Sequence, residues 1–474
     1  MSGREHEGVE RPACPFILTP AIASDQRSSA LRAENIRKTM KMVSSMARVS
    51  PSPNGPDGDV GVIGGPHERV ADAEARAFIR AALDRQALDG RNVVVIVPDA
   101  TRSCPLPFLL SCVHEALVER VRGMTFLVAL GTHAPMSESA LAAHLGYRPQ
   151  ELDATYPGVR VLNHEWWDPA TFVSVGTISG SRLSELSGGL LSEPVDVRIN
   201  RVVVDSDVAL IVGPVFPHEV VGFSGGNKYL FPGVAGQDII DISHWLGALI
   251  TSASIIGTRA VTPVRALIDE AASLICAPKT ALCLVVGSGS GALHAVTFGS
   301  SEHAWAAAAE IAAETHVRYL DAPVKRVLSI IPPKYDDIWT AAKGFYKLEP
   351  VVADGGEVIL YAPHVHRLSA MHPEIERIGY HCRDYFVGQW DRFKHLHWGV
   401  LAHSTHLRGA GSWDAETGER CRLQVTLATG IPEDVVQRAN LGYLDPSTMD
   451  LDTYAADPDT LVVPNAGEVL FRLR

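Results

Sequence analysis

The chain alternates between segments with helical spacing of apolar residues and short runs that are apolar throughout. Residues 70–88 and 107–120 have apolar positions three or four residues apart, which is typical of a helix with one buried face. The runs 92-NVVVIVPDATR-102 and 124-MTFLVALGTH-133 are rich in β-branched residues and end in polar ones, and similar runs occur at 201–218, 281–291, 326–337 and 356–366. Strands buried on both faces have this pattern, so the sequence predicts an α/β fold with mostly parallel, helix-covered sheets.

The length of the chain, 474 residues, indicates more than one domain. We expect an N-terminal extension at 1–65, an N-terminal α/β domain at 66–290 and a C-terminal α/β domain at 291–445. The C-terminal segment 446–474 is a candidate for returning to the N-terminal domain. Two α/β domains of this kind would place an active-site cleft between them.

The charge balance indicates a small-molecule partner. The chain has 42 Lys and Arg against 54 Asp and Glu, a net charge of -12, whereas binding to nucleic acid requires a basic face. Its apolar runs are shorter than the roughly 18 residues of a membrane span, and its first residues lack the apolar centre of a secretory signal. We therefore expect a cytoplasmic protein that binds neither nucleic acid nor membrane. Nothing in the sequence indicates an oligomeric state.

Polar residues follow three of the predicted strands at the point where each strand ends. Asp99, Thr101 and Arg102 follow the first of these strands, His133 follows the second and His218 the third. In parallel sheets ligands bind beyond the carboxyl ends of the strands. Arg102 could recognise an anion with its planar guanidinium, or it could form a structural ion pair with Asp99.

The segment 213-GPVFPHEVVGFSGGNKYLFPGVAGQDIIDISHW-245 combines His218, Lys228 and His244 with many glycines. It is not a P-loop, because Asn227 separates Gly226 from Lys228 and no Ser or Thr follows the lysine. A helix is expected from His244 onward, with Asp241 or Ser243 as its N-cap. The nitrogen side chains could bind a metal, shuttle protons or hold a ligand, or they could be hydrogen-bonded loop residues.

Three weaker patterns leave alternatives open. The segment 287-GSGSGA-292 satisfies a dinucleotide motif, but a simple tight turn explains it as well. His403 and His406, in a patch that begins at His395, could share a helix face and bind a metal, or they could simply be polar. The tryptophans of 164-HEWWDP-169 are expected to pack or to form a pocket wall.

Taken together, the motifs resemble those of the lactate racemase family, whose members use a nickel-pincer nucleotide. The family's P-D-x-T-R motif reads 98-PDATR-102, its G-T-H motif reads 131-GTH-133, and its glycine-rich segment is matched by 217-PHEVVGFSGGNK-228 and 232-PGVAG-236. The resemblance covers roughly residues 85 to 350 and rests on several independent motifs.

The resemblance implies a racemase or epimerase that interconverts the configuration at the α-carbon of a small 2-hydroxy acid. Hydride would move to and from the nickel-pincer nucleotide, through a 2-keto acid. His244 would ligate nickel, and Lys228 would hold a sulfur arm of the cofactor, covalently in some members. His133 and His218 would be the catalytic bases on opposite faces of the substrate, because each enantiomer needs its own base. Proteins that make the cofactor would be transient partners.

The resemblance also implies roles for residues around these four. Asp99, Thr101 and the amides of Gly225 and Gly226 would lie at the cofactor in the N-terminal domain. Arg102 would lie near the cofactor and the substrate. Lys343, which the pattern places early in a helix, would bind the substrate carboxylate from the second domain.

Two departures from the family pattern and one candidate match bear on the substrate. Ala134 stands where the family often has Arg, Thr340 stands where it often has Gln, and Trp390 is the candidate for an expected pocket tryptophan. The substrate could therefore be lactate, a longer or aromatic acid, or an aldonic acid. The alternatives to this function are an NAD-dependent 2-hydroxy acid dehydrogenase that uses 287–292, and a non-catalytic carrier of the nickel cofactor.

Overall fold

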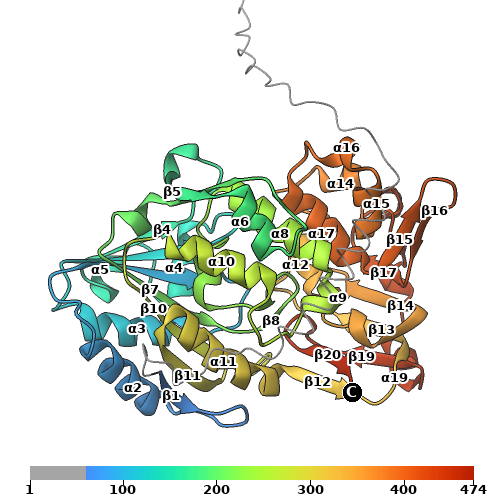
Figure 1. Ribbon diagram of the computed structural model, residues 1–474. Helices are drawn as coiled ribbons and strands as arrows, with labels where there is room; N and C mark the ends of the chain where they lie inside the picture. Colours follow the sequence, from blue (N-terminus) through green and yellow to red (C-terminus); the bar gives the residue numbers. More distant parts are fainter. Residues whose placement is uncertain (1–59) are drawn as a thin grey trace, which may run out of the picture.

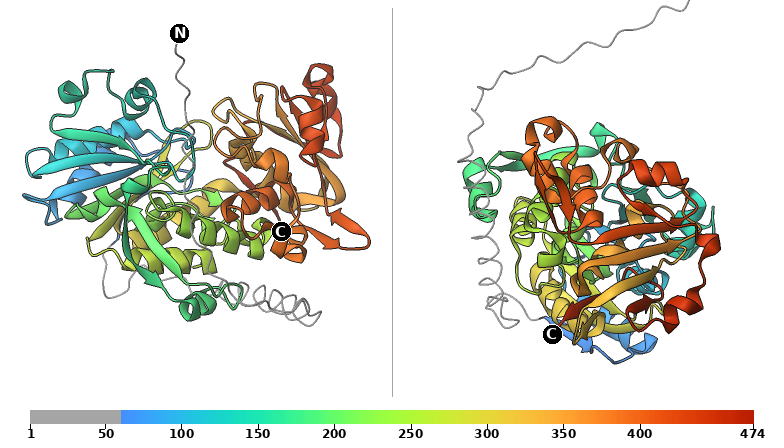
Figure 2. Two further views of the ribbon diagram at one scale, coloured as in Figure 1. Left: turned by 90° about the horizontal axis from the view of Figure 1, so that it is seen from above. Right: turned by 90° about the vertical axis from the view of Figure 1, so that its right-hand side faces the viewer.

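The computed structural model describes residues 60–474, which form two α/β units, each with its own sheet (Figure 1). The predicted α/β class with mostly parallel, helix-covered sheets is confirmed. Seen from above, the first unit, in blue and green, lies beside the second, in orange and red (Figure 2). Most of the expected extension at 1–65 lies outside the described residues, but β1 (Gly61–Gly64) already pairs with β11 as an edge strand of the first sheet.

The first sheet has seven strands in the order β1-β11-β10-β7-β2-β3-β4. Four neighbouring pairs, from β10 through to β4, are parallel, and the two pairs that involve β11 are antiparallel. Six of its strands follow β1: β2 (Asn92–Pro98), β3 (Gly123–Ala129), β4 (Val159–Asn163), β7 (Val208–Pro214), β10 (Lys279–Val286) and β11 (Leu293–Ser300).

The central strands of this sheet are buried on both faces, as their uniform apolar pattern predicts. Along β2, Val93, Val95 and Val97 belong to the core on one face, and Val94 and Ile96 belong to the core on the other. Helices α2 and α3 cover the first of these faces, and α8, α10 and α11 cover the second. Their bounds are α2 (Asp72–Asp84), α3 (Leu106–Leu117), α8 (Gln237–Ile250), α10 (Pro263–Ser273) and α11 (Ser301–His316).

Two local predictions for this unit were wrong. The expected strand at 201–218 begins with a helical turn, α7 (Arg201–Val204), for which Asn200 caps the Val202 amide, and only β7 and the two-residue strand β8 (Pro217–His218) are extended. Helix α8 begins at Gln237 instead of His244, with Gly236 at its N-cap and Asp238 in its first turn, where a carboxylate stabilises the helix dipole. The predicted caps therefore lie inside the helix, and His244 lies in its third turn.

The segment 287-GSGSGA-292 is a tight turn. It joins β10 to the antiparallel strand β11, and the Gly287 amide donates to the Ala292 carbonyl at 2.8 Å. A dinucleotide motif must lead into a helix whose N-terminus faces the pyrophosphate. Because a strand follows here, the structure contradicts the dinucleotide hypothesis for this segment.

The second sheet has five parallel strands in the order β18-β17-β14-β13-β19. It begins at residue 324, so the expected boundary after residue 290 falls between two strands of the first sheet. The first unit extends beyond residue 290 because β11 and α11 return to pack on β10. The strands are β13 (Val324–Ile330), β14 (Val352–Ala362), β17 (Gln424–Thr429), β18 (Gly442–Tyr443) and β19 (Thr460–Val463).

The C-terminal segment divides between the two units. Strand β19 is an edge of the second sheet, whereas β20 (Leu470–Leu473) pairs in parallel with β12 (Val317–Leu320), which follows α11 directly. Arg472 in β20 also donates to the Ala253 carbonyl of the first unit at 3.0 Å. Only the last residues of the expected segment 446–474 therefore return to the first unit.

Shorter elements complete both units. In the first unit they are α4 (Glu138–Leu145), α5 (Leu152–Thr155), β5 (Phe172–Ile178), α6 (Gly180–Leu186), β6 (Val195–Asn200), β8 (Pro217–His218), β9 (Gly222–Phe223) and α9 (Ser252–Ile255). In the second unit they are α12 (Ile338–Ala341), α13 (Lys343–Tyr346), α14 (Ile375–Ile378), α15 (Arg383–Gly388), α16 (Trp390–Phe393), α17 (Trp398–Arg408), β15 (Gly411–Asp414), β16 (Gly418–Cys421), α18 (Glu433–Arg438) and α19 (Leu451–Ala456).

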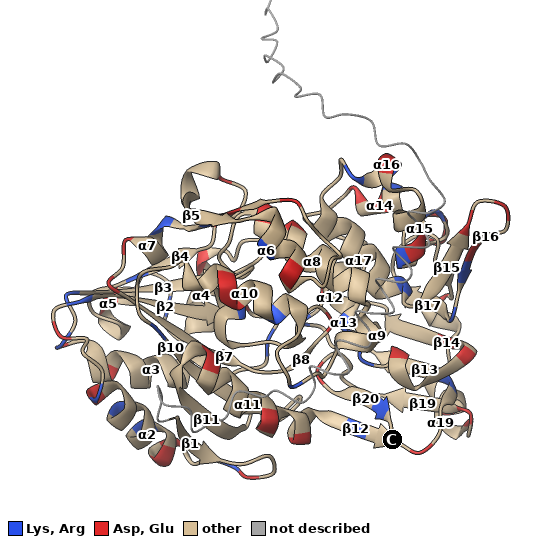
Figure 3. Ribbon diagram, in the orientation of Figure 1, with Lys and Arg blue, Asp and Glu red and all other residues tan. Residues whose placement is uncertain are grey.

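Acidic and basic residues are interspersed over the outer elements of both units (Figure 3). Some of them form surface pairs, such as Arg182 with Glu270 and Arg326 with Asp457. Exposed pairs of this kind contribute little to stability. None of the helices within residues 60–474 combines the length and the apolar character needed to cross a bilayer.

Candidate active site

A cavity lies between the two units, where the carboxyl ends of β2, β3 and β7 face α13 and α17. Its position agrees with the rule that ligands bind beyond the carboxyl ends of parallel strands. Two of the expected site residues, Thr101 and Gly226, do not line it, although Thr101 lines a smaller cavity that shares Arg102, His218 and Lys343 with it. Eight expected site residues line the larger cavity: Asp99, Arg102, His133, His218, Gly225, Lys228, His244 and Lys343.

The side chain of His133 is oriented by Asp99. His133 Nδ1 lies 2.5 Å from Asp99 Oδ2, and Thr101 donates its hydroxyl to Asp99 Oδ1 at 2.7 Å. Burial alone would raise the pKa of Asp99, but His133 and the nearby charge of Arg102 hold it well below its usual range. Because the Asp99 carboxylate can only accept, a neutral His133 ring would carry its proton on Nδ1, which would leave Nε2 free to accept a proton.

His218 is held differently. It ends β8, which pairs with β9, and its Nδ1 accepts a hydrogen bond from the Val220 amide at 3.1 Å. Burial, together with the positive charge of Lys228, lowers its pKa well below the ordinary value, so the ring is neutral. A neutral ring that accepts at Nδ1 carries its proton on Nε2. Glu219 Oε2, 3.3 Å from Nδ1, is the carboxylate that could accept a proton there instead.

The glycine-rich loop is held from beneath by a buried arginine. The Arg265 guanidinium donates to the carbonyls of Phe223 at 2.6 Å and Gly225 at 3.1 Å, and it lies 4.1 Å over the Trp305 ring. Gly225 and Gly226 have φ of +92° and +56°, and a Cβ at Gly226 would meet Trp305. The need for glycine thus comes from the turn and from its packing, and only Gly225 reaches the cavity.

Lys228 and His244 each present an unused nitrogen. Burial, followed by the charge of Arg102, lowers the pKa of Lys228 to about 7, so a large share of its amine is neutral near neutral pH. His244 Nδ1 lies 2.7 Å from the Ile240 carbonyl of the preceding turn of α8. A carbonyl can only accept, so His244 donates from Nδ1, and its Nε2 lone pair is available to a metal or a proton.

Lys343 enters the cavity from the second unit. It begins α13, is 5% exposed, and its Nζ lies 5.3 Å from the centroid of the Tyr335 ring. Burial and the charge of Arg102 lower its pKa to about 8. Arg102 stays charged: burial opposes its charge, but Asp99 raises its pKa above the ordinary value. Lys343 and Arg102 therefore make the cavity suitable for anions.

Several cavity residues were missed or misjudged from the sequence. Trp339, and not Trp390, is the tryptophan that lines the cavity. Trp390 instead stacks on Trp245, with the two ring centroids 5.1 Å apart. Among the tryptophans of 164–169, Trp166 supports the site by donating to the His133 carbonyl at 2.9 Å. Nothing in the sequence marked Trp339. Other lining residues that were not proposed for the site are Glu219, Tyr346, His403 and His406.

Comparison with known proteins identifies the first unit. Residues 66–257 match the lactate racemase N-terminal domain. Lactate racemase of Lactiplantibacillus plantarum is 28% identical over 167 residues, which are 34% of this chain and 34% of that protein. Lactate racemase of Thermoanaerobacterium thermosaccharolyticum is 27% identical over 158 residues, 32% of each chain. The matched region thus spans about a third of the length of these curated relatives.

Two solved structures extend the comparison to the second unit. A protein of Thermotoga maritima is 31% identical, with a TM-score of 0.79, over 87% of this chain and all of that chain. The lactate racemase apoprotein of T. thermosaccharolyticum has a TM-score of 0.61 at 19% identity, over 84% of this chain and 93% of that chain, and this likeness shows the fold. The resemblance seen in the motifs is confirmed: residues 66–257 of the chain match the N-terminal domain of lactate racemase.

Proposed function

We propose that the protein is a racemase or epimerase of 2-hydroxy acids that uses a nickel-pincer nucleotide. The observation that carries the proposal is that His133, His218, Lys228, His244 and Lys343 line the same cavity, although they come from separate segments of both units. A protein that only carried the cofactor would have no need for two histidines in different hydrogen-bonding states beside it.

The residues fit the proposed cofactor. Lys228 has a lowered pKa and, among the described residues, its amine has no hydrogen-bond partner, so it would be able to hold a sulfur arm of the cofactor. His244 offers one imidazole nitrogen to nickel. Within residues 60–474, no group of three or more His, Cys, Asp and Glu is placed to hold a metal ion, so the other ligands would come from the nucleotide. When bound, the nucleotide would accept hydride from the α-carbon and return it.

The protein residues would bind the substrate and move its protons. Protonated Lys343, with Arg102, would bind the carboxylate. His133 Nε2, free to accept, would take the proton of the 2-hydroxyl as hydride leaves the α-carbon. His218 would donate a hydrogen bond from Nε2 to the substrate oxygen. For the opposite configuration His218 would accept the proton, with its own proton moved to Nδ1 beside Glu219.

The test uses protein coexpressed with enzymes that make the cofactor. Nickel content and intact mass would report cofactor binding. Single enantiomers of a panel of 2-hydroxy acids, incubated in deuterium oxide, would be scored by chiral chromatography. We expect inversion with little deuterium at the α-carbon, because hydride does not exchange with solvent. Bound NAD, or inversion with full exchange, would contradict the proposal. Bound nickel without inversion of any acid would favour a carrier.

A further inference from the structure

Helix α17 presents two histidines to the cavity. His403 and His406 are three residues apart, so they lie on the same face of the helix, and both line the cavity. Their exposed fractions are 8% and 4%. The Nε2 atom of each is buried and has no hydrogen-bond partner among the described residues. An unpaired buried polar atom costs on the order of 1–3 kcal/mol, so two of them beside a binding cavity indicate groups that await a ligand.

Both rings are fixed by their other contacts. His403 stacks on Trp339 with ring centroids 3.9 Å apart, and Trp339 stacks on its other side against His372 at 4.1 Å. His406 Nδ1 lies 2.6 Å from the Ser252 hydroxyl of the first unit. The orientation of the two Nε2 atoms is therefore set before any ligand binds.

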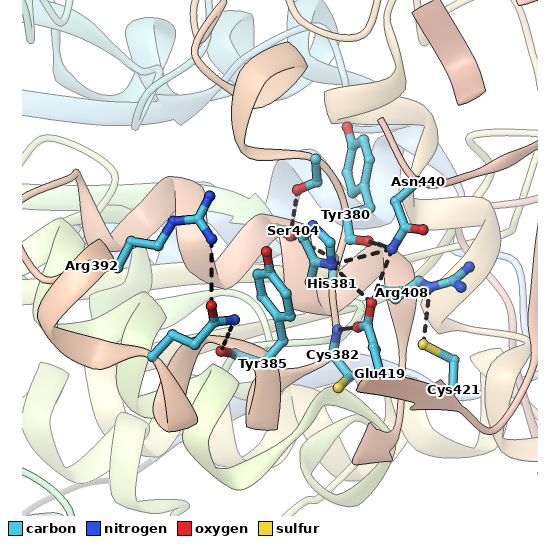
Figure 4. A network of polar contacts seen from close by, with 12 residues as sticks. Tyr380, His381, Cys382, Tyr385, Arg392, Ser404, Arg408, Glu419, Cys421 and Asn440 are labelled. Atoms are coloured by element: carbon cyan, nitrogen blue, oxygen red, sulfur yellow. Dashed lines mark hydrogen bonds and ion pairs between the residues drawn. The ribbon is translucent and has the colours of Figure 1, made fainter. Parts of the chain in front are cut away.

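The helix that carries the two rings is anchored from outside the cavity (Figure 4). Ser404, between the two histidines, donates its hydroxyl to the Gly379 carbonyl at 2.8 Å and accepts from the His381 amide at 2.9 Å. At the end of α17, Arg408 Nε donates to Cys421 Sγ at 3.0 Å. These contacts hold the opposite side of α17 and keep the face with the histidines against the cavity.

The chemistry of these nitrogens matches hydroxyl groups. A neutral imidazole nitrogen can donate or accept, depending on which nitrogen holds the proton. The Ser252 hydroxyl can accept from His406 Nδ1 or donate to it, so the Nε2 of His406 can present either a proton or a lone pair. A substrate hydroxyl group can accept a hydrogen bond from an N–H or donate one to a nitrogen lone pair. An alkyl or aryl chain would instead bury both nitrogens without partners.

We propose that His403 and His406 bind hydroxyl groups beyond the 2-position, so that the substrate is a polyhydroxy 2-hydroxy acid of the aldonic type. The inference rests on the proposed function, because Lys343 and the bases His133 and His218 must hold the carboxyl end of the same molecule. A pocket that pairs its polar groups with substrate hydroxyls rejects analogues that lack them, because those groups then stay unpaired.

The first experiment measures kcat/KM for inversion on the nickel-loaded, full-length enzyme. The panel contains lactate, phenyllactate, glycerate and aldonates of four to six carbons. We expect aldonates to exceed lactate and phenyllactate by about 100-fold or more, since the site is built around hydroxyl pairing. Equal or faster inversion of lactate or phenyllactate would overturn this inference and leave the proposed function standing. Absence of inversion with every acid would overturn both.

The second experiment uses variants of the two histidines. His403→Phe keeps a ring to stack on Trp339 but removes both ring nitrogens of His403. His406→Leu removes both ring nitrogens of His406. Each variant should lower kcat/KM for the best aldonate by about tenfold or more, which is equivalent to about 1.4 kcal/mol. The slow inversion of lactate and the nickel content should stay within about threefold of the wild-type values. His366→Leu, at an exposed position of the second unit, is the matched control. Loss of nickel, or an equal loss with lactate and aldonate, would overturn the inference.

Discussion

The Asp99 carboxylate lies 2.5 Å from His133 Nδ1 and thereby sets which nitrogen of that ring faces the cavity as a base. His218 has the opposite arrangement, because its Nδ1 accepts a backbone amide. The two catalytic candidates are thus not equivalent in this state. The resemblance implies that Asp99 lies at the cofactor; in the structure Asp99 lines the cavity and also contacts His133.

Asp99→Asn should lower the turnover for inversion by about 100-fold or more, because the neutral amide no longer holds the proton of His133 on Nδ1. Nickel content should be unchanged. The measurement is kcat on the best acid of the panel, with nickel determined on the same preparation. Thr101→Val, which removes only the 2.7 Å bond to the carboxylate, is the control and should cost less than tenfold. A fully active Asp99→Asn enzyme would refute the positioning role.

His244→Ala should release nickel. Its Nε2 lone pair is left free because Nδ1 donates to the Ile240 carbonyl, and no second histidine on α8 could replace it. We expect at least a tenfold drop in the nickel retained after gel filtration, since each ligand contributes strongly to metal affinity. His397→Ala, at the start of α17, is the control and should keep its nickel. Retention of full nickel by His244→Ala would remove this residue from the metal site.

Substrate binding should weaken as the pH rises through about 8. The pKa of Lys343 is lowered to about 8, so the ammonium that would bind the carboxylate is present below that pH and lost above it. KM for the acid should therefore rise on the alkaline side, with a smaller effect on kcat. Lys343→Arg keeps the charge to high pH and should abolish this rise, whereas Lys343→Met should raise KM at every pH. An alkaline rise that survives in Lys343→Arg would assign the titration to another group.

The apolar runs in the sequence predict six strands of the two sheets, because burial leaves a largely apolar run in each: β2, β3, β7, β10, β13 and β14. The other strands of the two sheets were not predicted: β1, β4, β11, β17, β18 and β19. The prediction fails where a helix cap interrupts an apolar run. The run at 201–218 looked continuous, but Asn200 starts a helical turn in it. The boundary after residue 290 was misplaced because β11 returns antiparallel to β10, a pairing that no local pattern announces.

The site was predictable where residues follow strand ends or lie in the glycine-rich loop, and this holds for His133, His218 and Lys228. It was less predictable where tertiary packing decides. Whether Trp339 or Trp390 lines the cavity depends on how α12 and α16 pack, and each tryptophan lies in a helix of only four residues. The facing of α17 toward the cavity is likewise set by contacts of residues far apart in sequence.

A buried ion pair links the two units beside the cavity. Lys334 Nζ lies 2.5 Å from Glu468 Oε1 and 3.0 Å from the Ser103 hydroxyl, and the Gly289 amide donates to Glu468 Oε2 at 3.1 Å. The Glu468 side chain is only 6% exposed, and that of Lys334 is 26% exposed. Glu468→Gln should lower the free energy of unfolding by roughly 2 kcal/mol, less than for a fully buried pair, because water still reaches the lysine.

The pH dependence separates this ion pair from simple packing. Burial would raise the pKa of Glu468, but Lys334 lowers it from 4.5 to about 2. A lowered carboxyl pKa stabilises the folded state fully above pH 4.5, and this stabilisation is lost as the pH falls toward 2. The Tm of wild type should therefore exceed that of Glu468→Gln by several degrees at pH 7, and calorimetry should find a smaller gap at pH 3.5. Asp459→Asn, in an exposed pair with Lys325, should leave Tm unchanged at both pH values. A gap that stays constant with pH would mean that Glu468 acts through shape and hydrogen bonding alone, without its charge.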